Sequence, residues 1–501
     1  MVPLELKMAM DKLVWEHLGS LKQQPGSDRQ VVAFFDMDRT LIVGFSALAV
    51  VWESIRRRRS GMIHIGREML VNIDRGGGGQ RYINLYLDLL KSMAGTDESA
   101  FRELGELAFA HSLEASIYRE ARQIVRLHKQ LGHKVVIVSA ATNYQVEPIA
   151  RALGIDEVLC TRLEVAEGKL TGAIVGELCY GEGKLNAART LLKHYRARQR
   201  DAWFYSDSAD DLPLLKKVGY PVVTNPSPAL ADYANQAGWR ALKFSSRGKP
   251  NLESVVRTAL MTNTLVSTAA GGAASWFFSR SPKRATNLMT SWLGGIGSAF
   301  AGLEIEVEGR AHLESVRPAI FTFNHQSNLD SVVMAYLLQH DVVAFCKKEL
   351  ADHLLLGPLL KAHGTIFVDR EAADQSLCLE QAKAALLAGK SLAIAPEGTR
   401  SASGELLDFK HGAFYLAKKL KLPIVPVVLH NVADALPKGS LWLRPATIRV
   451  TVLPPLLPEN LGNLRQSIHG LRQDYQAVMD AEWGGAQIAA THTRAPVALS
   501  A

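Results

Sequence analysis

The chain has 501 residues, too many for one hydrophobic core, because single cores stop growing at about 250–300 residues. Its composition, 48% hydrophobic and 21% charged, is that of a globular protein, and its net charge of +8 favours anionic partners. The four scattered cysteines contain no CxxC pair, which excludes a disulfide framework and a cysteine-based zinc site and suits a reducing compartment.

The first part of the chain has the pattern of an α/β domain. Residues 4–22 within the opening segment 1–30 predict an amphipathic helix, and the charged residues there argue against a secretory signal. A fully apolar run from Val31 to Phe35 predicts a buried parallel strand. Further strands are expected at 134–138, 202–205 and 221–224. This alternation predicts a doubly wound parallel sheet over residues 31–245.

The first two of these strands are unusually far apart. A strand–helix–strand unit takes roughly 30 residues, yet about 100 separate the two strands here. We therefore expect a helical cap at about residues 44–110. It contains the basic run 56–59, which is either a lipid-phosphate grip or a solvated helix face.

Two uncharged stretches mark the predicted boundary segment 246–304. Residues 259–278 and 285–303 contain no charged side chain, and Arg280, Lys283 and Arg284 lie between them. Each stretch is just long enough to cross a bilayer at about 20 residues. A membrane-associated helical hairpin with a basic turn is one interpretation, and a pair of buried helices in a linker is the other.

A second α/β pattern follows over residues 305–484. Candidate strands are 319–323, 365–368, 391–395 and 424–429. The two α/β halves share no motif. The remaining residues, 485–501, lack periodicity, and we expect them to be disordered.

Acidic and phosphate-binding residues follow the strands of the first half in order. Asp36 and Asp38 end the first strand, where α/β proteins place their ligands. Ser139, Lys184 and the segment 207–211 follow. In this order the residues resemble the four motifs of the haloacid dehalogenase superfamily, specifically its phosphoserine-phosphatase-like branch, over residues 30–240.

This resemblance implies a Mg²⁺-dependent phosphomonoesterase. Asp36 would attack phosphorus to form an aspartyl-phosphate, and Asp38 would act as general acid and then base. Ser139 and Lys184 would hold the phosphoryl oxygens. Mg²⁺ would be held by Asp36, Asp207 and the Asp38 carbonyl, with Asp211 in support.

Two positions in these motifs depart from a common pattern of the superfamily. Arg39 and Ser206 stand where glycine is frequent, and we expect neither side chain to take part in the chemistry. In the cap, Glu53 and Arg56 lie about where phosphoserine enzymes recognise the amino acid. Phosphoserine is therefore an alternative to a lipid or glycerol phosphate as substrate, and a non-catalytic membrane-tethering module is a third interpretation.

The second half carries a histidine and an aspartate directly after its first strand. His325 and Asp330 lie in a turn, where the two side chains can face each other. A second pair with the same spacing, His469 and Asp474, lies in a helical stretch, where five residues correspond to about 140° of rotation. Only the first pair is therefore a candidate site.

Downstream segments support the first pair. Residues 367–370, 396–401 and 425–427 each lie at a strand end, and with 324–330 they resemble the four blocks of the lysophosphatidate and glycerol-phosphate acyltransferase family. The resemblance implies that His325 is a general base oriented by Asp330. It further implies substrate contacts from five residues: Lys348, Arg370, Glu397, Gly398 and Arg400.

Together the two resemblances predict a bifunctional enzyme of phospholipid metabolism. The expected partners are acyl-CoA or acyl-carrier protein, lysophosphatidate or a related glycerol phosphate, and an anionic membrane surface. The expected location is the cytoplasmic face of the cell membrane. Nucleic acid is not expected, because no aromatic-interleaved basic groove motif is present.

Overall fold

The computed structural model describes residues 12–22, 30–57, 79–155, 157–247, 250–353, 356–369, 376–401 and 404–484. The chain divides into two compact units, 4–249 and 250–501. Each has its own sheet and its own core. The division follows from chain length, because one core could not enclose so many residues.

The N-terminal unit is built on a seven-stranded sheet in the order β4-β3-β2-β1-β5-β6-β7. The strands are β1 (Val32–Phe35), β2 (Lys134–Thr142), β3 (Glu157–Ala166), β4 (Lys169–Val175), β5 (Trp203–Ser206), β6 (Tyr220–Thr224) and β7 (Arg240–Leu242). All neighbours pair in parallel except β3 and β4, which form an antiparallel hairpin. The carboxyl ends of β1, β2 and β5 therefore meet at one edge.

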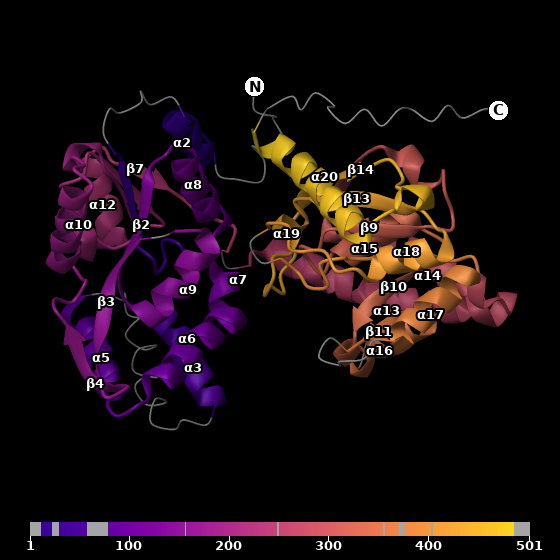
Figure 1. Cartoon of the computed structure of the whole chain (residues 1–501), viewed down its shortest axis with the longest axis horizontal. Helices are drawn as coiled ribbons and strands as arrows, with labels where there is room; N and C mark the ends of the chain where they lie inside the picture. Colours follow the sequence, from indigo (N-terminus) through magenta and orange to yellow (C-terminus); the bar gives the residue numbers. More distant parts are fainter. Residues whose placement is uncertain are drawn as a thin grey trace. The chain divides into compact units, whose positions relative to one another are not determined.

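Helices cover both faces of this sheet, as a fully apolar central strand requires. They are α2 (Lys12–Lys22), α8 (Arg119–Gln130), α9 (Asn143–Leu153), α10 (Glu182–His194), α11 (Leu212–Leu215) and α12 (Pro228–Gln236). Ala33 and Phe35 face the core shared with α2 and α8, whereas Val32 and Phe34 face α10 and α12. The two helix groups lie on opposite sides of the strands in Figure 1.

Between β1 and β2 the chain forms a set of helices at one end of the sheet. They are α3 (Ser46–Arg56), α5 (Gly79–Lys91), α6 (Glu98–Ala108) and α7 (Glu114–Ser116). Their apolar faces join the core of the sheet through residues such as Val50, Leu90 and Leu104. Part of the predicted cap, residues 58–78, lies outside the described residues, including two of the four consecutive arginines.

The N-terminal helix is anchored beneath the sheet by a buried histidine. Nε2 of His17 lies 2.8 Å from the hydroxyl of Tyr205 on β5. Burial and the nearby Arg240 lower the pKa of His17 to about 3, so the ring is neutral. Residues 4–11 of the predicted amphipathic helix lie outside the described part of the chain.

The C-terminal unit also has a seven-stranded sheet, in the order β11-β10-β12-β9-β13-β14-β8. The strands are β8 (Leu303–Glu308), β9 (Ile320–Phe323), β10 (Val342–Lys347), β11 (Ile366–Val368), β12 (Ser391–Ile394), β13 (Ile424–His430) and β14 (Ala446–Val452). Pairing is parallel throughout except between β13 and β14. Strand β9 lies at the centre of this sheet, between β12 and β13.

Helices again cover both faces. They are α13 (Leu252–Ser279), α14 (Pro282–Ala301), α15 (Asp330–Leu338), α16 (Leu356–His363), α17 (Ser376–Leu387), α18 (Gly412–Leu420), α19 (Val432–Ala435) and α20 (Leu464–Gly484). Phe321 and Phe323 face the core shared with α15, whereas Ile320 faces α17, α18 and α20. The hydroxyl of Tyr475 on α20 donates to the Thr322 carbonyl at 2.7 Å, which ties that helix to β9.

The two uncharged stretches of the sequence form the helical hairpin α13–α14, which belongs to the C-terminal unit. Helix α14 packs closely on α15, because a Cβ on Gly294 would lie 2.4 Å from the Tyr336 backbone nitrogen. Lys283 and Asp341 form an ion pair of 3.0 Å at the turn. Among the helices of the described residues, none combines the length and apolar character needed to cross a membrane.

Every strand expected from an apolar run is present, with ends that shift by a few residues. The strands that sequence reasoning missed, β3, β4, β7, β8, β10 and β14, lie toward the sheet edges or alternate between apolar and charged residues. Their pairing depends on neighbours distant in sequence, so the local pattern is weak.

Candidate active sites

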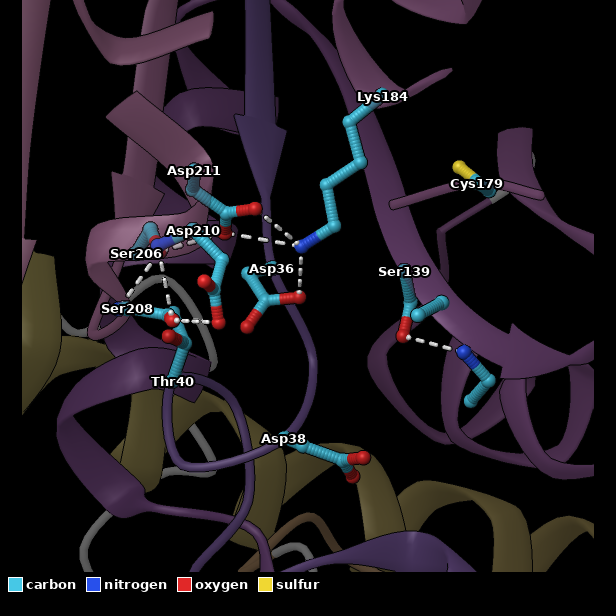
Figure 2. A network of polar contacts seen from close by, with 12 residues as sticks. Asp36, Asp38, Thr40, Ser139, Cys179, Lys184, Ser206, Ser208, Asp210 and Asp211 are labelled. Carbon is cyan, nitrogen blue, oxygen red and sulfur yellow. Dashed lines mark hydrogen bonds and ion pairs between the residues drawn. The ribbon is translucent and has the colours of Figure 1, made fainter. Parts of the chain in front are cut away.

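In the N-terminal unit the residues of the four motifs meet at the carboxyl edge of the sheet. Asp36 follows β1, Ser139 lies on β2, and Asp207 follows β5. Lys184 comes from the first turn of α10. Figure 2 shows Asp36, Lys184 and Asp211 pointing toward one another in the centre of this group.

Lys184 is the centre of the polar network. Its Nζ donates to Oδ1 of Asp36 at 2.7 Å and to the Asp211 carboxylate at 2.9 Å. Burial alone would lower the pKa of this lysine, but the two carboxylates outweigh it and raise the pKa. Lys184 therefore stays charged and screens the negative charge that a phosphate ester would meet at Asp36.

Burial nevertheless disfavours the charged forms of two of these carboxylates. Burial raises the pKa of Asp36 to about 7 despite Lys184, and it raises the pKa of Asp207 well above the usual range. Burial is the largest cause because it disfavours the charged form, and the neighbouring carboxylates add to it.

Asp38 lies in the same cavity, but its carboxylate points away from Asp36 (Figure 2). It accepts hydrogen bonds from the backbone nitrogen of Ser46 at 2.8 Å and from its hydroxyl at 3.2 Å. Burial raises the pKa of Asp38 to about 6. These contacts hold the Asp38 carboxylate at the start of α3, facing the cap.

Arg39 and Ser206, from which we expected no role, both contact the acidic group. Nε of Arg39 lies 3.1 Å from Oδ2 of Asp207. The hydroxyl of Ser206 donates to Asp211 at 2.6 Å. The backbone preference for glycine did not indicate these contacts, because both positions adjoin strand ends and direct their side chains into the site.

The cavity above Asp36 has a volume of about 70 Å³, and its lining includes Asp210 and the four aspartates named in the motifs, as well as Ser139, Lys184 and Arg39. Phe45, Ala47, Tyr86 and Tyr180 complete much of its wall. The Ser139 hydroxyl accepts from the Ala141 backbone nitrogen at 3.2 Å.

The oxygen donors of this site are of the type that a hard cation binds, but their side chains are not now arranged to hold one. Oδ2 of Asp207 is buried and accepts no hydrogen bond of regular geometry within the described residues. Buried carboxylate oxygens of this kind are the ligands that Mg²⁺ prefers. In the described part of the chain, however, no three His, Cys, Asp or Glu side chains are grouped closely enough to hold a metal ion.

The two cap residues expected to recognise an amino acid are engaged with each other. The carboxylate of Glu53 is buried and lies 2.9 Å from Nδ1 of His111 and 3.7 Å from the Arg56 guanidinium. Neither Glu53 nor Arg56 is among the described residues that line the cavity.

In the C-terminal unit, His325 and Asp330 form a close pair directly after β9. Nδ1 of His325 lies 2.7 Å from Oδ2 of Asp330, which is fully buried. The same oxygen accepts the backbone nitrogens of Gln326 at 2.8 Å and Ser327 at 3.0 Å. The Asp330 carboxylate accepts a hydrogen bond from Nδ1, so Nδ1 carries the ring proton. The other ring nitrogen, Nε2, therefore carries the free lone pair.

Glu397 supports the loop that carries this histidine. Its carboxylate accepts the backbone nitrogens of His325 at 2.7 Å and Leu407 at 2.9 Å. Burial raises the pKa of Glu397 to about 7. Both carboxylate oxygens of Glu397 accept backbone hydrogen bonds, and only 3% of the residue is exposed. Glu397 therefore holds the backbone of the site in place.

Two of the remaining candidate substrate contacts, Gly398 and Arg400, belong to the segment that adjoins this pair. Gly398 has a φ of +71°, a conformation that favours glycine. The backbone nitrogen of Ser401 donates to the His325 carbonyl at 2.8 Å, so the adjoining Arg400 lies beside the pair. Lys348 is exposed and forms an ion pair with Asp369 at 3.3 Å. Arg370 lies outside the described residues.

Comparisons with known proteins agree with both sites. A family model described as haloacid dehalogenase-like hydrolase matches residues 33–216, and one described as acyltransferase matches residues 304–430. A probable phosphatase of Mycobacterium tuberculosis (strain ATCC 25618 / H37Rv) is 33% identical over 230 residues, 44% of this chain and 79% of that protein. A phosphoserine phosphatase of the same strain is 29% identical over 281 residues, 52% of this chain and 84% of that protein.

The second half has relatives of another kind. A 1-acyl-sn-glycerol-3-phosphate acyltransferase of Limnanthes alba is 37% identical over 176 residues, 34% of this chain and 62% of that protein. The chain therefore spans less than two thirds of that relative. By its N-terminal half the chain belongs to the haloacid dehalogenase-like hydrolases, and by its C-terminal half it carries an acyltransferase domain. It is thus an enzyme with a phosphatase head and an acyltransferase head.

Proposed function

We propose that the chain is a bifunctional enzyme of phospholipid metabolism. Its acyltransferase head would transfer an acyl group from acyl-CoA or acyl-carrier protein to 1-acyl-sn-glycerol-3-phosphate, giving phosphatidate. Its phosphatase head would hydrolyse a phosphomonoester through an aspartyl-phosphate. The observation that carries the first activity is the His325–Asp330 pair at 2.7 Å. The second rests on Asp36 and its hydrogen bond with Lys184.

At the acyltransferase head, Nε2 of His325 would take the proton from the glycerol hydroxyl as its oxygen attacks the thioester carbonyl. Asp330 would stabilise the imidazolium that forms. The carbon–sulfur bond then breaks, and the proton held by His325 passes to the leaving thiolate. Arg400 and Arg370 are the candidate contacts for the acceptor phosphate, because guanidinium groups match phosphate oxygens, and Lys348 is a third candidate through its ammonium charge.

At the phosphatase head, an Asp36 oxygen would attack phosphorus while the bond to the leaving oxygen breaks. Asp38 would donate a proton to that oxygen and then accept one from the water that hydrolyses the aspartyl-phosphate. Its raised pKa of about 6 suits both roles near neutral pH. Ser139 and Lys184 would hold the phosphoryl oxygens.

We infer that this head uses Mg²⁺. The ion would be held by Asp36, Asp207 and the Asp38 carbonyl, with Asp211 in support, and it would neutralise the charge of the transferring phosphoryl group. The support for this inference is the excess of buried carboxylates and the buried Asp207 oxygen described above.

A lipid or glycerol phosphate is the substrate class that we favour for the phosphatase head. The cavity wall facing the cap contains Phe45, Ala47 and Tyr86. Phosphoserine is the second candidate, since one relative carries that name. The burial of Glu53 against His111 and Arg56 speaks against it, because those groups are occupied. A non-catalytic tether is less favoured, because all four catalytic carboxylates line one cavity.

We further propose that the enzyme works on the cytoplasmic face of the cell membrane, attached through the hairpin α13–α14. Near the end of α13, Trp276, Phe277 and Phe278 are exposed, the last by 84%. Arg280, Lys283 and Arg284 follow at the turn. Aromatic and basic side chains together suit the interface of an anionic bilayer.

A substrate screen on parallel variants tests the two activities. Wild type, Asp36→Asn and His325→Ala are assayed for phosphatidate formation from lysophosphatidate with each acyl donor. Phosphate release is measured with lysophosphatidate, phosphatidylglycerol phosphate and phosphoserine. We expect Asp36→Asn to lose phosphate release alone and His325→Ala to lose acyl transfer alone. Undiminished phosphate release by Asp36→Asn would refute the assigned nucleophile.

Vesicle sedimentation tests the membrane proposal. Phe277→Ser with Phe278→Ser should weaken binding to vesicles containing anionic lipid. Leu387→Ser, which changes an apolar side chain on α17 that is 69% exposed, is the matched control and should bind normally. Equal binding by both variants would contradict attachment through the tip of α13.

A further inference from the structure

Arg39 occupies a backbone position that is costly for an arginine. Its φ is +63°, in the left-handed region, and its backbone nitrogen donates to the Gly44 carbonyl at 3.1 Å in the turn after β1. For residues other than glycine this conformation costs about 1 kcal/mol. The backbone alone would favour glycine, so the feature to explain is the side chain.

That side chain reaches a carboxylate assigned to the metal. Nε of Arg39 lies 3.1 Å from Oδ2 of Asp207, the same buried oxygen that accepts no regular hydrogen bond within the described residues. The guanidinium carbon lies 5.8 Å from the centre of the Phe45 ring. The Arg39 side chain is 31% exposed, whereas that of Asp207 is 3% exposed. The arginine therefore enters the site from its open side.

The distribution of charge around Asp207 favours this contact. Lys184 is committed to Asp36 and Asp211 by hydrogen bonds of 2.7 Å and 2.9 Å. Among the ion pairs of the described residues, Asp207 has Arg39 as its cationic partner. Arg39 thus supplies at Asp207 the positive charge that a divalent cation would supply.

We propose that Arg39 is a built-in counter-ion of Asp207 that a divalent cation must displace, so that Arg39 sets the cation affinity of the phosphatase head. The proposal rests on the proposed function, because it takes Asp207 as a ligand of Mg²⁺. A guanidinium does not lose its proton in proteins, so Arg39 competes by its charge at every working pH. Its exposure and its contact with Phe45 give it a place to move toward the mouth of the cavity.

Calorimetric titration of the full chain with Mg²⁺ tests the proposal without relying on activity. Arg39→Gln removes the charge and keeps the backbone penalty, with a shorter polar side chain, and we expect it to bind Mg²⁺ about tenfold more tightly than wild type. Arg39→Lys keeps the charge and should bind within about twofold of wild type. Arg39→Gly relaxes the backbone and should gain the same affinity as Arg39→Gln, which guards against a folding defect in the latter. Raising the salt concentration should reduce the difference, because the competition is electrostatic.

Asp207→Asn separates the possible failures. If wild type binds Mg²⁺, Asp207→Asn does not, and Arg39→Gln binds no more tightly than wild type, the counter-ion role is overturned while the metal site stands. If no variant binds Mg²⁺ in a manner sensitive to Asp207→Asn, the proposed metal site fails, and the counter-ion role fails with it. Tighter binding by Arg39→Gln and Arg39→Gly, together with wild-type binding by Arg39→Lys, supports the proposal.

Discussion

In both heads the candidate catalytic side chains lie at the ends of strands. The two sites differ in how far their charged groups are paired within the chain. In the acyltransferase head, the carboxylate of Asp330 accepts hydrogen bonds from the His325 ring and from two backbone nitrogens. Glu397 accepts one from the backbone nitrogen of His325 and so holds the loop that carries it. In the phosphatase head, burial raises the pKa values of Asp36 and Asp207, and the neighbouring carboxylates add to the shift. The charges of the first site are paired within the chain, whereas for the second we propose that a bound cation completes the balance.

Metal removal should separate the heads most strongly. With EDTA, phosphate release should fall by at least about a thousandfold, because the carboxylates then repel the phosphate ester. Acyl transfer should not change, since the His325–Asp330 pair needs no ion. Both activities are measured on the same preparation, and added Mg²⁺ should restore the first. An equal loss of both activities would end the distinction between the two sites.

Asp330→Asn tests whether acyl transfer depends on the hydrogen bond between His325 and Asp330. The amide cannot stabilise the imidazolium and favours the wrong tautomer, so kcat for acyl transfer should fall by about 10³–10⁴. Phosphate release and thermal unfolding are measured in parallel to exclude general damage. Asp474→Asn, which alters the second histidine–aspartate pair on α20, is the control and should leave kcat unchanged.

Glu397→Gln sharpens the comparison through pH. In the folded protein, burial raises the pKa of Glu397 from 4.5 to about 7, so its stabilising contribution is complete below pH 4.5 and is lost as pH rises through 7. Relative to Glu397→Gln, the free energy of unfolding of the wild-type C-terminal unit should fall by up to about 3 kcal/mol over that range. Denaturant titrations at several pH values measure it. Parallel pH profiles of the two proteins would show that the carboxylate is not buried as described.

The smallest expected effect concerns the hairpin that supports the acyltransferase head. Gly294→Ala should lower the free energy of unfolding by about 1–3 kcal/mol, because the added methyl group meets the backbone of Tyr336 at 2.4 Å. Gly295 has no atom within 4 Å of its would-be Cβ, so Gly295→Ala should be neutral or stabilise by up to about 1 kcal/mol. Similar values for the two variants would mean that α14 does not pack on α15 as described.

Much of the site could be predicted from the sequence because its residues lie next to fully apolar strands. Asp36 follows β1 and His325 follows β9, and such central strands can be recognised in the sequence as uninterrupted apolar runs. The role of Arg39 could not be read in this way. Its partner Asp207 is distant in sequence, and a preference for glycine says nothing about the direction of a side chain.

The sequence by itself determined the two α/β halves, the order of their motifs and the choice of His325 over His469, because apolar runs and helical spacing are local properties. Tertiary structure alone decided which charges share a partner: Lys184 with Asp36 and Asp211, and Arg39 with Asp207. It also assigned α13 and α14 to the C-terminal unit. The physical reason is that ion pairs and helix packing depend on distances between segments remote in the chain, which a linear pattern does not contain.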